Sequence, residues 1–218
     1  ADYSQGPPVR FWVRVVRNKP EEEIRRVLHK QYAINQRFFE YAEAHGGGRL
    51  ACCRPVALLA DQQALITREC SGLRFDVHLK RQLMFKRKRV APFFAECGRL
   101  LRLFHDCFAQ GEQHGEAGWS ACQERFRSRH QREPSPGLAE LTTCHTDFSP
   151  RNLFVSREGV ELIDFVGAVP GFPEEDLFFF LNYVRKARFN GLYSRRVKRD
   201  CLERFLAGYD PALSLDCF

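Results

Sequence analysis

The segment Cys144–Leu177 reads CHTDFSPRNLFVSREGVELIDFVGAVPGFPEEDL and is the most informative part of this chain of 218 residues. Within it, His145 and Asp147 are followed by Asn152, and a short apolar stretch leads to Asp164 in the tripeptide IDF. Phosphoryl transfer needs a carboxylate that orients an attacking hydroxyl and accepts its proton. It also needs a second carboxylate and an amide oxygen that hold Mg²⁺ against the phosphates of a nucleotide. The segment supplies these groups in that order along the chain.

The residues around these polar groups predict a fixed loop followed by a β-hairpin. A Phe-Ser-Pro sequence directly after Asp147 favours a restrained loop over a helix. Strands are expected at 153–155 and 160–163, joined by the turn sequence REG. Antiparallel pairing places the start of one strand beside the end of its partner. We therefore expect Asn152 and Asp164 at the same edge of the hairpin, within reach of one metal ion.

This pattern resembles the aminoglycoside phosphotransferase and choline kinase family, which has a protein-kinase-like fold. The segment is similar to the family's H-x-D-x-x-x-x-N, I-D-[FW] and G-x-P-x-x-D-L motifs. The resemblance implies that Asp147 is the catalytic base and that Asn152 and Asp164 are ligands of Mg²⁺. It further implies that His145 braces the catalytic loop and that Asp176 holds this loop from the following helix.

The residues before the segment predict a small antiparallel sheet and one long helix. Residues 9–16 (VRFWVRVV) are rich in β-branched and aromatic side chains, which favours a strand. A helix with an apolar stripe follows and ends at the three glycines that begin at Gly46. Two further strands are expected at 55–59 and 64–68.

The remainder of the chain is mainly helical in pattern. Helices are expected over 76–110, over 119–130, and from Asp176 onward. The sequence therefore predicts an α+β, protein-kinase-like two-lobed fold. Residues 1–71 would form an abbreviated nucleotide-side lobe with a small antiparallel sheet. Residues 72–218 would form a mainly helical lobe that contains the catalytic loop and the metal-binding hairpin.

The nucleotide-binding side departs from the family pattern. Family members place a lysine on the third strand of the small lobe and a glutamate on the helix. Here Arg14 stands where the lysine is expected and Gln31 where the glutamate is expected, with Lys19 as the alternative to Arg14. The loop that covers the phosphates is missing or very short. By position, Glu69 and Cys70 are expected to present backbone atoms to adenine.

Composition restricts the remaining function classes. The net charge is +7, and the densest basic run is Lys80–Arg89. This run is either a solvated helix face or a surface for an anionic or lipid-linked substrate. No nucleic-acid recognition motif accompanies the charge, so we expect no nucleic-acid partner. The nine cysteines show no framework, and neither a signal peptide nor a transmembrane segment is evident, which predicts reduced thiols in a cytoplasmic protein.

Two functions remain open. The first is an ATP- and Mg²⁺-dependent phosphotransferase that phosphorylates a hydroxyl of a small molecule such as a sugar, an amino alcohol or an antibiotic. The alternative is a catalytically weak or inactive kinase-like module with a binding or regulatory role, which Arg14 and Gln31 motivate. The intact set of Asp147, Asn152 and Asp164 favours the enzyme.

Overall fold

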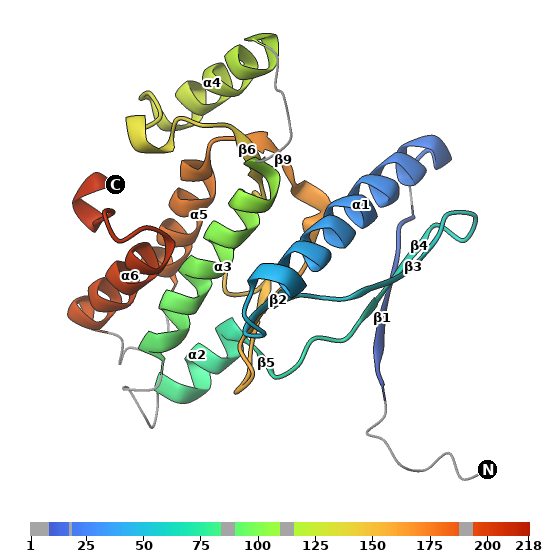
Figure 1. Ribbon diagram of the computed structural model, residues 1–218, viewed down its shortest axis with the longest axis horizontal. Helices are drawn as coiled ribbons and strands as arrows, with labels where there is room; N and C mark the ends of the chain where they lie inside the picture. The colour runs from blue at the N-terminus through green and yellow to red at the C-terminus, as the bar shows by residue number, and fades with distance from the viewer. Residues whose placement is uncertain (1–8, 18, 84–89, 110–115, 188–193) are drawn as a thin grey trace.

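The chain folds into a mixed α+β structure with a small sheet at one end and a helical part at the other (Figure 1). The computed structural model describes residues 9–17, 19–83, 90–109, 116–187 and 194–218. Among these residues, no helix is both long enough and apolar enough to cross a membrane. All nine cysteines are free thiols and eight of them are buried; the cytoplasmic location stays a prediction.

The small sheet contains the three strands that the sequence predicts. β1 (Phe11–Val15) pairs antiparallel with β4 (Ala64–Arg68), which pairs antiparallel with β3 (Pro55–Leu59). The long helix α1 (Glu21–His45) packs against this sheet and ends at Gly46. The sequence therefore located all four elements to within about two residues.

A second sheet contains the predicted hairpin and connects it to the rest of the chain. β7 (Leu153–Val155) and β8 (Val160–Leu162) pair antiparallel. Their outer edges pair with β5 (Leu73–Arg74) and β2 (Leu50–Cys52), so the strand order is β2-β8-β7-β5. β2 follows α1 in sequence and runs parallel to β8, which fixes the hairpin beside the end of that helix. The boundary between residues 71 and 72 stays a prediction.

The helical part contains five helices among the described residues. They are α2 (Phe75–Leu83), α3 (Ala91–Ala109), α4 (Glu116–His130), α5 (Pro173–Lys186) and α6 (Arg195–Tyr209). Short 3-10 turns lie at η2 (Pro136–Leu138), η3 (Phe165–Gly167) and η4 (Leu215–Cys217), and β6 (Thr142–Cys144) pairs with β9 (Val169–Gly171).

The expectation of one helix over 76–110 was wrong, because the structure has two separate helices there. α2 ends at Leu83 and α3 begins at Ala91. Pro92 lies in the first turn of α3, where proline starts a helix but cannot continue one. Most of the predicted basic run Lys80–Arg89 lies outside the described residues. Within them, the Lys80 ammonium lies 3.9 Å from the Asp76 carboxylate.

The core of the helical part is formed largely by α3 and α6, which run side by side (Figure 1). Two glycines allow this close approach. A Cβ atom on Gly98 would lie 2.0 Å from the Phe205 carbonyl oxygen, and one on Gly208 would lie 2.2 Å from the Ala95 carbonyl oxygen. Any larger side chain at either glycine would therefore push the two helix backbones apart. Phe94, Phe104, Phe180 and Phe205 fill the surrounding space.

Candidate functional site

The structure brings the predicted base and metal ligands together. Asp147 lies in the loop between β6 and β7, which is the catalytic loop of the family pattern. Asn152 directly precedes β7, and Asp164 follows β8. The Asn152 Nδ2 donates to the Asp147 Oδ2 and to the Asp147 carbonyl oxygen, each at 2.9 Å. The Ile163 amide donates to the Asn152 carbonyl oxygen at 3.0 Å. This bond closes the hairpin one residue before Asp164, so all three polar side chains line one cavity.

The backbone conformation at Asp164 is stabilised by burial of the next side chain, Phe165. Asp164 has a left-handed φ of 65° and begins the η3 turn. Phe165 is fully buried, with its ring centroid 5.9 Å from that of Phe104 and 6.1 Å from that of Phe38. Because α1 supplies Phe38 and α3 supplies Phe104, the position of Asp164 depends on the packing of both helices.

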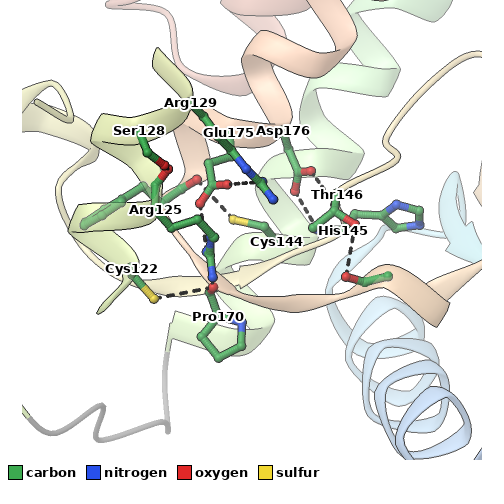
Figure 2. Close-up of polar contacts among 12 residues, drawn as sticks. Cys122, Arg125, Ser128, Arg129, Cys144, His145, Thr146, Pro170, Glu175 and Asp176 are labelled. Atoms are coloured by element: carbon green, nitrogen blue, oxygen red, sulfur yellow. Dashed lines mark hydrogen bonds and ion pairs between the residues drawn. The ribbon is translucent and has the colours of Figure 1, made fainter. Parts of the chain in front are cut away.

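The Asp176 side chain holds the catalytic loop by accepting hydrogen bonds from backbone amides of that loop. Its Oδ2 accepts a hydrogen bond from the His145 amide at 2.6 Å, and its Oδ1 accepts one from the Thr146 amide at 2.7 Å (Figure 2). The side chain is fully buried at the start of α5. The carboxylate therefore satisfies two amides immediately before Asp147, which is the arrangement that the family resemblance implies for Asp176.

His105 supports Asp176 from α3, and the sequence reading missed it. Its Nε2 lies 3.1 Å from the Asp176 Oδ2, and its Nδ1 lies 2.9 Å from the Tyr209 hydroxyl on α6. The signal in the sequence was weak, because His105 is a polar residue beside the apolar stripe of a helix. With Cys144, His105 and Asp176 also place three possible metal-ligand atoms within 4.8 Å of one another. The Cys144 thiol donates to the Phe172 carbonyl oxygen, and His105 pairs with Asp176, so each of the three groups already has a hydrogen-bond partner.

His145 lies behind the site rather than in it. Its Nε2 lies 3.0 Å from the Ile163 carbonyl oxygen, and its Nδ1 has no hydrogen-bond partner. Burial lowers the pKa of the imidazole, against the opposing effect of Asp176. A neutral ring that carries its proton on Nε2 fits both observations. His145 thus connects the catalytic loop to the strand that ends before Asp164.

The cavity has a volume of about 520 Å³ and lies between the small sheet and the hairpin. Trp12 and Leu65 line it from the small sheet, and Phe154 and Ile163 line it from the hairpin. Of the two residues expected to meet adenine, Cys70 lines the cavity and Glu69 does not. The Glu69 amide instead donates to the Arg10 carbonyl oxygen at 2.9 Å. The remaining lining residues are Arg14, Gln31, Cys53, Thr67, Arg74, Asp147, Arg151, Asn152 and Asp164. The cavity therefore has an apolar slot at the strands and a polar end at the catalytic loop.

Arg14 and Gln31 both lie in this cavity. The Arg14 Nη1 donates to the Asp164 Oδ1 at 2.6 Å, and both side chains are partly exposed. Lys19, the alternative cation, instead pairs with Glu23 at 2.5 Å and does not line the cavity. Gln31 is only 5% exposed, and its Oε1 has no hydrogen-bond partner. Arg14 thus lies beside Asp164 in the cavity, and its role as the phosphate contact stays a prediction.

The donor set at the polar end suits a hard divalent cation. Because the Asn152 amide nitrogen faces Asp147, its Oδ1 remains for a metal ion. Asp164 adds a carboxylate, and oxygen donors of this kind are the ligands that Mg²⁺ prefers. In the present structure the Asp164 Oδ1 pairs with Arg14, so a cation bound at this oxygen would compete with that contact.

This fold and this arrangement of side chains resemble those of kinase-like phosphotransferases, and comparison with protein families agrees. Residues 5–213 match the model of the phosphotransferase enzyme family. The match covers nearly the whole chain, and the chain belongs to this family. The resemblance predicted from the segment Cys144–Leu177 is confirmed. No curated protein matches the chain.

Solved structures give the same fold. An amicoumacin kinase in complex with AMP-PNP, Ca²⁺ and Ami has a TM-score of 0.51 at 14% identity, covering 85% of this chain and 63% of that one. A choline/ethanolamine kinase family protein from Mesorhizobium loti has a TM-score of 0.53 at 14% identity, covering 95% of this chain and 70% of that one. The chain thus spans under two thirds of the amicoumacin kinase. The predicted protein-kinase-like α+β fold is confirmed.

Proposed function

We propose that this chain is an ATP- and Mg²⁺-dependent kinase that phosphorylates a hydroxyl group of a small molecule. One observation carries the proposal: Asp147, Asn152 and Asp164 converge at the polar end of a cavity that also has an apolar slot. The similarity to a kinase solved with AMP-PNP and Ca²⁺ supports a nucleotide and a divalent cation as ligands. Catalysis of phosphoryl transfer is mostly positioning and electrostatic stabilisation, which such a cavity can supply.

The nucleotide would lie with its adenine in the slot between Leu65 and Ile163. Cys53 also lines the cavity, and burial raises the pKa of its thiol to about 12. The thiol therefore stays uncharged beside the base. The phosphates would then extend toward Asp164 and Asn152, which would hold Mg²⁺. When bound, Mg²⁺ neutralises the negative charge of the phosphates. Arg14, released from Asp164, would donate to a phosphate oxygen.

Asp147 would act as the base. Its carboxylate is oriented by the Asn152 amide at 2.9 Å and lies 3.5 Å from the Ser149 hydroxyl. It would accept the proton of the acceptor hydroxyl while that oxygen bonds to the γ-phosphorus. The bond between the γ-phosphorus and the bridging oxygen breaks, and ADP leaves with the electron pair. Because Asp176 fixes the backbone on the N-terminal side, Asp147 keeps its position during transfer.

The second candidate is a weak or inactive kinase-like binding module. The contact between Arg14 and Asp164 favours it, because the arginine competes with a metal ion for this carboxylate. Both side chains are partly exposed, however, and exposed ion pairs contribute only about 0–1 kcal/mol. A bound metal ion and nucleotide can therefore displace the contact, and we propose the active enzyme.

Nucleotide binding tests the proposal directly. Mg²⁺ with ATP should raise the thermal unfolding temperature, since a ligand at about 100 times its Kd adds about 2.7 kcal/mol of stability. Asp164→Ala should abolish the shift. Asp61→Ala removes an exposed carboxylate from the turn between β3 and β4, far from the site, and should keep it. No shift in the wild-type protein would contradict the proposal.

A further inference from the structure

A second cavity, of about 590 Å³, lies on the other side of the catalytic loop. Thr146 lines it, one residue before Asp147, and its other walls come from the end of α4 and from α5. Tyr183 contributes to this cavity, and its ring lies 5.3 Å from the guanidinium carbon of Arg151, which lines the nucleotide cavity. The two cavities therefore adjoin at the catalytic loop.

Ion pairs hold the two walls of this cavity together. The Glu175 carboxylate accepts from Arg125 Nη2 at 2.9 Å and from Arg129 Nη1 at 3.0 Å (Figure 2). Glu174, one residue earlier on α5, pairs with Arg132 just after α4. Both glutamates are buried, and the charge-assisted hydrogen bonds that satisfy them join α5 to α4 and to the residues just after α4. These contacts therefore determine how α4 lies against α5, and with it the shape of the cavity.

The charge on the described lining is positive. Glu175 is the only carboxylate among the lining residues, and two arginines already neutralise it. Arg129 remains 56% exposed at its side chain despite this pair. Lys186, on the last turn of α5, is exposed, and its ammonium has no ion-pair partner among the described residues. A cationic ligand would therefore meet repulsion without a carboxylate free to bind it.

The uncharged part of the lining is aromatic. Phe179 is 37% exposed, and Tyr183 lies one helical turn further along α5 on the same face. His130 stacks on Phe178 with ring centroids 4.6 Å apart, which adds a second aromatic surface. Asn182 and Lys186 lie on the exposed face beside these rings, so polar groups and ring faces alternate along one wall. Such a wall binds a flat body that carries a polar end.

We infer that this cavity is the acceptor site and that it selects an acceptor with a flat, apolar body and an acidic group. The inference rests on the proposed kinase function, because only then does a hydroxyl have to reach Asp147. The acidic group pairs with Lys186 and Arg129, and the ring lies against Phe179 and Tyr183. The hydroxyl then extends past Thr146 to the catalytic carboxylate. Polyamine acceptors are selected against by the same two cations.

Three probes of one shape test the charge preference. 4-(Hydroxymethyl)benzoate, benzyl alcohol and 4-(hydroxymethyl)benzylamine share a ring and a hydroxyl and differ in charge. With Mg²⁺ and ATP, we expect kcat/KM for ADP formation to be at least about tenfold higher with the benzoate than with the amine. Lys186→Glu should remove this preference. Lys30→Glu, a matched charge reversal at an exposed position of α1, should leave it unchanged.

The outcomes separate this inference from the proposed function. Equal use of the three probes, or preference for the amine, would overturn the inference while the kinase function stands. Absence of binding and turnover with all three, in a protein that Mg²⁺ and ATP stabilise, would do the same. If Mg²⁺ and ATP fail to stabilise the protein, the proposed function fails. Saturation-transfer NMR would still measure whether the benzoate binds and whether Lys186→Glu abolishes its binding.

Discussion

The two sides of the nucleotide cavity are built in different ways. On the side of the catalytic loop, each functional group is fixed by buried contacts: Asp176 holds the loop backbone, and Phe165 anchors Asp164. On the side of the small sheet, Arg14 lies on β1, all of whose residues are exposed, and it makes one partly exposed ion pair. We therefore expect the residues proposed for phosphoryl transfer to be held rigidly, and Arg14, the proposed phosphate contact, to change position more easily.

Replacing Asp147, the proposed base on the rigid side, should have the largest effect on activity. Asp147→Asn keeps the size of the side chain but removes the proton acceptor. We expect kcat to fall by about 10²–10⁴-fold, measured as ADP formation with a working acceptor. Stabilisation by Mg²⁺ and ATP should persist, because Asn152 and Asp164 remain. Loss of nucleotide binding in this variant would mean that Asp147 is needed for binding rather than for transfer.

Removing the support of the rigid side should affect both folding and catalysis. Asp176→Ala leaves two amides and His105 without their acceptor, and loss of a buried charged partner costs about 3–5 kcal/mol. We expect chemical denaturation to show this loss. Asp200→Ala, on the exposed face of α6, is the matched control and should change stability by under about 0.5 kcal/mol. A stable but inactive Asp176→Ala protein would show that the buried contacts serve positioning alone.

Changing Arg14, on the side of the small sheet, should have a smaller effect. Arg14→Ala should raise the KM for ATP by about tenfold, corresponding to one charge-assisted hydrogen bond, and leave unfolding free energy nearly unchanged. Arg14→Lys should recover part of the loss, because lysine keeps the charge without the planar fork. An unchanged or lower KM in Arg14→Ala would indicate that the arginine only competes with the metal ion for Asp164.

The pH dependence of stability should show the smallest effect. Burial lowers the pKa of His145 below its ordinary value of 6.5, so the unfolded chain binds this proton more readily than the folded one. Stability should therefore fall as the pH drops through and below about 6.5. His145→Gln should flatten this slope only in part, since burial also lowers the pKa values of His78 and His130. Unfolding temperatures at several pH values would measure it, and an unchanged slope would contradict the buried neutral ring.

The sequence predicted the features that depend on neighbouring residues. The hairpin, its turn and the closeness of Asn152 to Asp164 follow from local pairing, and the structure has them. β2 was missed because three residues carry little strand signal and its partner β8 is more than a hundred residues away. His105 was missed for the same reason, since only the fold brings it to Asp176. The second cavity depends on ion pairs between α4 and α5, which no local pattern reveals.

The close packing of α3 against α6 at Gly98 and Gly208 also has a consequence for synthesis of the protein. α3 is translated long before α6, and until α6 emerges the apolar face of α3 lacks its main cover. Ribosomes add about 5–20 residues per second, so this surface stays uncovered for several seconds. The nascent chain should therefore be a substrate for chaperones during that interval. Premature termination before α6 would leave a product that aggregates rather than a smaller working domain.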